Sequence, residues 1–145
     1  MKELRGSATA AVTASPDECV AFFLAVDRYP GWHPDVVRKV EVLERDADGT
    51  PTRAHGMLHV AVGPLVKDFD LILAVTREGL QSVKLARIPH GPGDHERFEV
   101  TWHVGTQIRL ELFADLSVPR FVPLGGVGDS MAQGFVSSAA RALRS

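Results

Sequence analysis

Two histidines have the spacing of a familiar zinc site. His55 and His59 are four residues apart, which would place two zinc ligands on one face of a helix. The residues around them alternate between polar and apolar, however, as in a strand. Four residues of a strand span about 13 Å, whereas zinc ligands lie about 2 Å from the metal. We therefore expect no metal site here and place both histidines on an exposed strand face.

Two carboxylates form a second candidate group. Asp68 and Asp70 are two residues apart, so on a strand their β-carbons would lie about 7 Å apart on the same side. That separation would suit a catalytic carboxylate pair. Phe69 and Leu71 occupy the opposite side and are typical of a buried face. The pattern favours a charged outer face over catalysis.

An arginine among apolar residues is the third candidate. Arg87 falls on the same strand side as Val83 and Leu85, so it could face inward. An inward guanidinium in an apolar pocket would anchor a ligand carboxylate, phenolate or carbonyl. Arg87 also lies near the expected end of its strand, from which its long side chain can reach water. We favour this second interpretation.

The composition limits the classes of function. The 145 residues are 45% hydrophobic and 23% charged, which predicts one packed domain over residues 1–145. The net charge is -2 and long basic runs are absent, so neither a nucleic-acid partner nor membrane insertion is expected. Cys19 is the only cysteine, which excludes an internal disulfide and a cysteine-based zinc site. We expect a cytoplasmic protein without a cofactor, and the sequence does not indicate its oligomeric state.

The first elements are a strand and a broken helix. Residues 7–14 alternate as in a strand, and Ser15, Pro16 and Glu18 then form a helix-starting signal with a capping box. Four apolar residues follow with the spacing of one helical face: Cys19, Phe22, Phe23 and Val26. Two prolines in residues 29–34 then leave room for at most one irregular turn.

Six strands and one long helical segment complete the chain. Turn signals separate strands expected at residues 37–45, 52–62, 66–77, 80–88, 97–104 and 107–118. Their short connections favour an antiparallel meander, and their alternation gives the sheet one apolar face. Residues 121–144 are the remaining segment long enough to cover that face.

The element order resembles that of the START-like superfamily, which includes the birch-pollen-allergen-like proteins. The clearest motifs are DRYPGWHP at 27–34, VEVLE at 40–44 and ADLSVP at 114–119. They are most similar to the actinobacterial polyketide cyclase/dehydrase and lipid-transport-like branch. The resemblance implies an α+β helix-grip fold. In that fold a seven-stranded antiparallel sheet wraps around a long C-terminal helix, and two short helices follow the first strand.

The resemblance also implies a cavity between the sheet and the C-terminal helix. We expect it to bind an apolar or aromatic small molecule such as a lipid, a quinone or a polyketide, without catalysis. The expected wall consists of inward-facing apolar residues: Trp32, Leu58, Val60, Phe69, Leu71, Leu73, Phe98, Val100, Trp102, Leu112, Met131 and Phe135.

Two other functions remain open. A polyketide aromatase/cyclase would need acid and base groups among the apolar walls, for which the weak candidates are His33, Arg87 and Tyr29. Trp32 and His33 follow the helix break, at the mouth expected for this fold. The plainer interpretation makes Trp32 a core residue and His33 an exposed loop residue, and we favour it for both. A protein-partner module would need an exposed apolar or basic patch, and no such patch stands out.

Four glycines mark the C-terminal segment: Gly125, Gly126, Gly128 and Gly134. Glycine within a helix is destabilising by roughly 0.5–1 kcal/mol relative to alanine, so these positions need a reason. They allow either close approach to the sheet or flexibility beside a ligand. We favour the second use, in which residues 121–128 form a gate and residues 129–144 the firm part of the helix.

Overall fold

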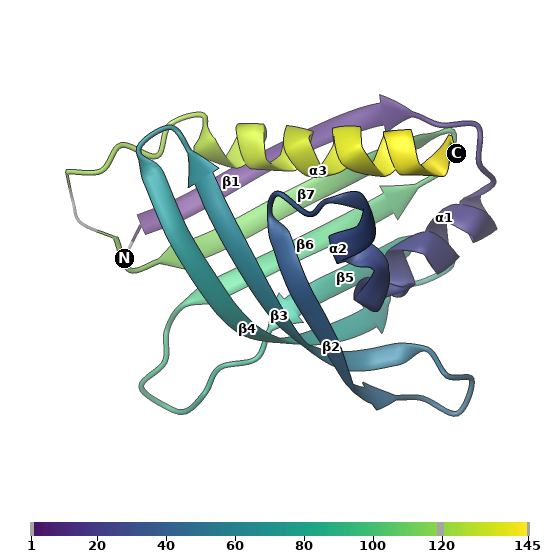
Figure 1. Cartoon of the computed structure of the whole chain (residues 1–145), viewed down its shortest axis with the longest axis horizontal. Helices are drawn as coiled ribbons and strands as arrows, with labels where there is room; N and C mark the ends of the chain where they lie inside the picture. Colours follow the sequence, from purple (N-terminus) through teal and green to yellow (C-terminus); the bar gives the residue numbers. More distant parts are fainter. Residues whose placement is uncertain (1, 119–120, 145) are drawn as a thin grey trace.

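A computed structural model describes residues 2–118 and 121–144. Within them the chain forms seven strands, two α-helices after β1 joined by a 3-10 turn, and a C-terminal helix (Figure 1). The elements are β1 (Lys2–Ala11), α1 (Pro16–Leu24), η1 (Val26–Arg28), α2 (Tyr29–Trp32), β2 (Val37–Arg45), β3 (Pro51–Val62), β4 (Leu65–Arg77), β5 (Ser82–Arg87), β6 (Arg97–Val104), β7 (Gln107–Leu116) and α3 (Val127–Leu143). None of the described helices is both long and apolar enough to span a membrane.

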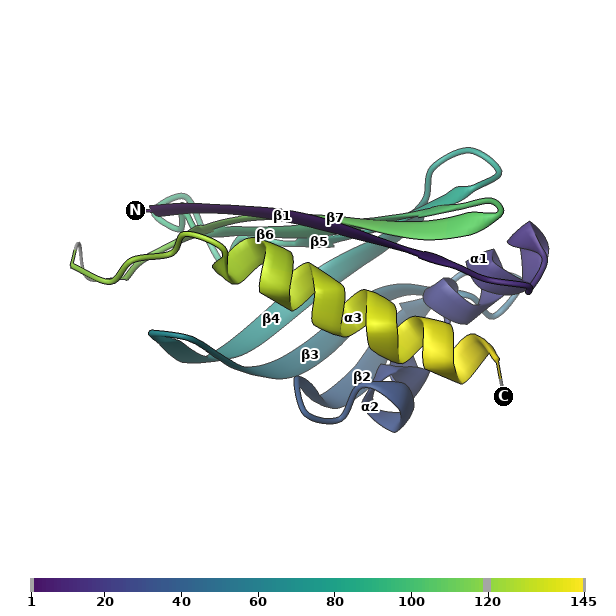
Figure 2. The same ribbon diagram turned by 90° about the horizontal axis from the view of Figure 1, so that it is seen from above.

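The strands form one antiparallel sheet in the order β1-β7-β6-β5-β4-β3-β2. The sheet curls, so that α3 packs on β1 and β7 while β2, β3 and β4 pass on its other side (Figure 2). Irregular register between β2 and β3, at Val37/Lys39 and again near Glu44, accompanies this curvature. The predicted helix-grip arrangement is confirmed.

Local sequence explains the short helices. The Ser15 side chain accepts a hydrogen bond from the Glu18 amide at 3.2 Å, and the Glu18 carboxylate accepts one from the Ser15 amide at 3.4 Å. This is the predicted capping box at the start of α1. Pro30 lies in the first turn of α2, where an amide has no partner within the helix, so the proline is tolerated there.

Alternating residues of the strands build the core. Trp102 is fully buried, and its ring stacks on that of Phe23 from α1 with centroids 3.9 Å apart. The inward residues of β4, β6 and β7 are buried as their alternation predicts. Their burial supplies the main stabilisation of the sheet against α1 and α3.

The C-terminal helix begins later than the sequence suggests. Residues 121–126 are irregular, and α3 begins at Val127. Gly126 adopts a left-handed conformation with φ 78°, which an L side chain rarely takes up. Pro123 disfavours helix in the residue before it. These two local signals explain why only the later part of residues 121–144 is helical.

The first turn of α3 lies directly on the β1 backbone. A Cβ added to Gly128 would lie 2.1 Å from the carbonyl oxygen of Arg5, and one added to Gly6 would lie 2.1 Å from the carbonyl oxygen of Gly128. The Asp129 carboxylate also accepts a hydrogen bond from the Ser7 amide at 3.0 Å. Gly128 therefore serves close packing, contrary to the role in a gate that the sequence had suggested.

Candidate ligand-binding site

An apolar cavity of about 40 Å³ lies between the curled strands and α3. Only carbon atoms face it, because every contributing polar group points elsewhere. Strands β2 to β6, the turn after α1 and the middle of α3 supply its wall: Val26, Tyr29, Val37, Val40, Ala54, Gly56, Leu58, Leu73, Leu85, Phe98, Val100 and Phe135. A cavity without polar partners does not stabilise a water molecule, so this one is expected to be dry.

A second hollow of about 110 Å³ lies between β3 and α3. Its wall is apolar except for two residues, and it is lined by His33, Val36, Val60, Val62, Ser130, Met131, Gly134 and Phe135. Phe135 lines both spaces. Phe135 therefore borders both the dry cavity and the second hollow, and we call it the Phe135 partition.

The predicted wall residues divide into two groups. Five of them line the apolar cavity: Leu58, Leu73, Phe98, Val100 and Phe135. Three line the second hollow, namely Val60, Met131 and again Phe135. Trp32, Phe69, Leu71, Trp102 and Leu112 line neither space. Alternation predicts burial, but it does not distinguish a side chain beside a void from one in filled core.

Sequence reasoning missed much of the cavity wall. The missed residues are Val26, Val37, Val40, Ala54, Gly56 and Leu85, whereas Tyr29 was considered only as a catalytic candidate. One signal was present in β3, where the inward positions 54 and 56 hold the small residues alanine and glycine. Small residues on the inner face of a curled sheet leave space unless a larger neighbour fills it.

His33 is buried, which corrects the expectation of an exposed loop residue. It is 7% exposed, and its Nδ1 lies 2.8 Å from the Ser138 hydroxyl of α3, 105 residues away in sequence. Its Nε2 is buried without a hydrogen-bond partner among the described residues. Burial lowers the pKa of the imidazole, while the nearby Asp35 carboxylate acts in the opposite direction. Helix α2 turns the ring under α3, a long-range contact that local pattern could not reveal.

The other two catalytic candidates have protein partners. The Tyr29 hydroxyl donates to the Phe23 carbonyl at 2.7 Å, and burial raises the pKa of this phenol. The Arg87 guanidinium makes two hydrogen bonds to Asp94, at 2.8 and 2.6 Å, and one to the Glu96 carbonyl at 2.8 Å.

Arg87 therefore closes the loop between β5 and β6 and neither reaches water nor faces the cavity. Its side chain is 7% exposed. The hydrogen bond to Asp94 raises the pKa of the arginine, and the same pairing holds the pKa of the Asp94 carboxyl well below its usual range. The three catalytic candidates do not converge: Tyr29 lines the dry cavity, His33 the second hollow and Arg87 neither.

Trp32 is a packing residue beside the site. It is half-buried, and its ring lies against Phe22 and Tyr29 with centroid separations of 5.1 and 4.7 Å. It lines neither the cavity nor the second hollow. Trp32 is therefore better described as a residue packed against the core than as part of the cavity wall.

The outer face of the sheet carries the charged groups. All four residues lie on the outer face, as predicted, and they form two cross-strand pairs that were not predicted: His55 with Asp70, and His59, whose Nδ1 lies 2.6 Å from the Asp68 carboxylate. No group of three His, Cys, Asp or Glu side chains in residues 2–118 and 121–144 is arranged to hold a metal ion.

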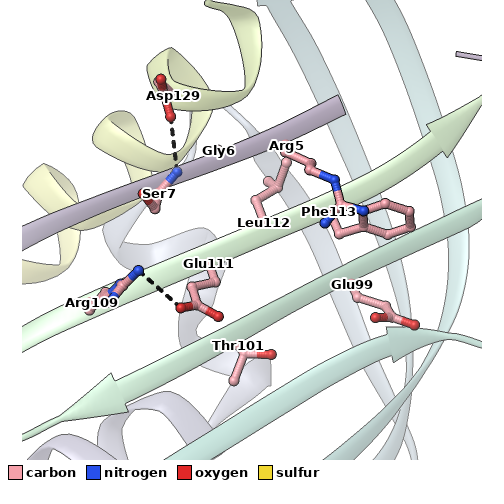
Figure 3. A pocket seen from close by; sticks show the side chains of 10 residues that line it. All are labelled: Arg5, Gly6, Ser7, Glu99, Thr101, Arg109, Glu111, Leu112, Phe113 and Asp129. Atoms are coloured by element: carbon pink, nitrogen blue, oxygen red, sulfur yellow. Dashed lines mark hydrogen bonds and ion pairs between the residues drawn. The ribbon is translucent and has the colours of Figure 1, made fainter. Parts of the chain in front are cut away.

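A shallow hollow of about 400 Å³ also opens on the outer side, across β1, β7 and β6 (Figure 3). Arg109 and Glu111 form an ion pair there at 3.1 Å, and the Arg5 guanidinium lies 4.5 Å from the centre of the Phe113 ring. Charges of both signs line this open surface. Its wall is more polar than the walls of the cavity and of the second hollow.

Solved structures with this architecture are numerous. The chain has the START-like fold. A START superfamily protein from Mycobacterium smegmatis superposes with a TM-score of 0.63 and 22% identity, over 96% of this chain and 93% of that one. A STAR-related lipid transfer protein from Xanthomonas axonopodis gives a TM-score of 0.61 at 15% identity, over 96% and 85% of the two chains.

A third match is a di-domain aromatase/cyclase of the steffimycin biosynthetic pathway. It gives a TM-score of 0.60 at 8% identity and covers 96% of this chain but 50% of its own. No protein-family model matches the chain, and no curated protein matches it in sequence. At these identities the likeness establishes the START-like fold and leaves function to the site itself.

Proposed function

We propose that this START-like protein binds an apolar or aromatic small molecule between the sheet and α3. The observation that supports this most directly is the dry cavity, an unfilled space with an apolar wall between the sheet and α3. Protein interiors rarely retain such voids, because the atoms lining them lose dispersion contacts. A ligand that fills the space restores those contacts and adds about 25 cal/mol of gross stabilisation per Å² of apolar surface removed from water.

The occupant needs more room than the cavity alone offers. An apolar cavity of about 150 Å³ can bind benzene, whereas this cavity measures about 40 Å³. Displacement of the Phe135 side chain would join the cavity to the second hollow, since that side chain lines both. The ligand therefore enters beside α3 and takes the place of the Phe135 ring.

The similar structures agree with this class of ligand. One is named a lipid transfer protein and another an aromatase/cyclase. A lipid, a quinone or a polyketide-like aromatic molecule would each match an apolar wall without charged groups. The protein would act by non-covalent binding.

Titration with a fluorescent fatty acid or an anthracene derivative tests the proposal. Ala54 faces the cavity, so Ala54→Leu fills it and should weaken binding at least tenfold. Ala86 lies on the outward side of β5, and Ala86→Leu is the matched control with unchanged affinity. Binding that fails to saturate, or that is equally tight in both variants, would contradict the proposed site.

A further inference from the structure

His33 lines the second hollow and has one ring nitrogen that is buried without a partner among the described residues. The side chain lines that hollow, it is more than nine-tenths buried, and its Nε2 has no hydrogen-bond partner among the described residues. Gly134 faces the same edge of the ring, since a Cβ added there would lie 3.8 Å from Cε1 and 4.0 Å from Nε2. A methyl-sized group would therefore fit beside this edge of the ring at ordinary van der Waals distance.

The Ser138 contact indicates which nitrogen carries the proton. If Nδ1 were protonated, it would donate to the Ser138 oxygen, and neither the serine hydrogen nor Nε2 would have a partner among the described residues. If Ser138 donates to Nδ1, the proton lies on Nε2, and a single unpaired group remains. Buried polar groups without partners are costly, so the second arrangement is favoured. His33 then offers an N–H donor to the hollow.

We propose that His33 Nε2–H donates a hydrogen bond to an acceptor oxygen of the ligand, a carbonyl or carboxylate attached to an apolar body. The assignment rests on the proposed function and specifies its ligand class. The hollow has exposed Ser130 at one side and the Phe135 partition at the other. The oxygen would therefore lie near the entrance, while the apolar body passes Phe135 into the dry cavity.

Burial supports a neutral donor. It lowers the pKa of His33, so the ring is uncharged near neutral pH and keeps its N–H without the cost of a buried charge. A neutral N–H donor pairs with a ketone, ester or quinone oxygen as well as with a carboxylate.

Two probes with the same aromatic body test the assignment. 2-Acetylnaphthalene carries an acceptor oxygen and 2-ethylnaphthalene does not, and each is titrated into the wild type and into His33→Phe. The ratio of their dissociation constants is compared between the two proteins, which cancels the difference in hydration of the probes. We expect the wild type to favour the acetyl probe roughly three- to tenfold more than His33→Phe does.

The outcomes separate this inference from the proposed function. If both probes bind and the ratio of their dissociation constants is the same in both proteins, the proposed function is supported and the His33 assignment is overturned. If neither probe saturates the wild type, the proposed function fails and the assignment fails with it.

Nitrogen-15 NMR of the His33 ring gives a second measurement that needs no variant. The free protein should show a proton on Nε2 and none on Nδ1. The Nε2–H resonance should move downfield with the acetyl probe and stay in place with the ethyl probe. A proton on Nδ1, or the same shift with both probes, would overturn the assignment.

Discussion

The first turn of α3 and its middle pack against the sheet in opposite ways. At Gly128 the helix backbone touches the β1 backbone so closely that no side chain fits between them. Two turns later, around Gly134 and Phe135, the same helix stands beside the second hollow and the dry cavity. The close contact at one end anchors the helix, so the space further along is kept open by the fold.

An unfilled space can persist in a small domain when the elements around it are held in place. A void in a core is normally lost as neighbouring elements move inward. Here the Gly6–Gly128 contact holds the first turn of α3 on β1, while β3 of the same curled sheet passes beside the helix further along. Disruption of the packed region should therefore cost stability, whereas changes beside the hollows should chiefly alter binding.

The largest expected effect is in the filled core. Trp102→Ala removes the ring that stacks on Phe23, and truncation of a buried aromatic side chain typically costs about 3–5 kcal/mol. Chemical denaturation should show this loss in the free energy of unfolding. Leu80→Ala, at an exposed position, is the control and should have little effect. Equal stability of the two variants would mean that the aromatic stack does not hold α1 on the sheet.

The helix anchor should show the next largest effect. Gly128→Ala places a methyl group against the Arg5 carbonyl and forces α3 away from β1, at a cost of about 1–3 kcal/mol or more. Gly125→Ala has open space around its Cβ and serves as the matched control. Thermal melts compare the two variants, and a stable Gly128→Ala protein would show that the contact is not an anchor.

Stability should fall in mildly acid solution because of His33. Burial lowers the pKa of His33 in the folded state below its usual value of about 6.5, so the unfolded chain takes up the proton first. The free energy of unfolding should therefore have its highest value above about pH 7. It should decrease as the pH falls below the pKa of His33 in the unfolded chain.

His33→Phe should flatten this decrease between pH 7 and 5, as measured by urea unfolding. The Asp94 carboxylate affects stability at a lower pH than His33, because its pKa lies well below the usual range. Its contribution to the free energy of unfolding is lost only when the carboxylate becomes protonated. An Asp94→Asn variant therefore serves as a control that should keep the decrease between pH 7 and 5. An unchanged slope in His33→Phe would contradict the burial of a neutral imidazole.

The smallest predicted effect has opposite signs for stability and binding. Gly134→Ala should stabilise α3 by about 0.5–1 kcal/mol, since the new Cβ makes ordinary contacts with His33. The same methyl group narrows the space beside Nε2 and should weaken binding of 2-acetylnaphthalene. A stabilised variant with unchanged affinity would place the ligand elsewhere along α3.

Much of the fold could be predicted from the sequence because its signals are local. The capping box at Ser15 and Glu18 depends on neighbours three residues apart, and the inward side of β6 follows from the alternation that ends at Trp102. The candidate site was predicted less well. Seven of the predicted wall residues line one or both of the two spaces, whereas Ala54 and Gly56 were missed.

The alternation of residues was enough to predict which strand side chains lie inside, since side-chain direction along a strand is a property of the local backbone. Tertiary structure alone decided which inside residues border empty space, because a void depends on the distance between elements far apart in the chain. His33 shows this most clearly. Its partner Ser138 and its open neighbour Gly134 come from a helix a hundred positions away, which only the curl of the sheet brings to it.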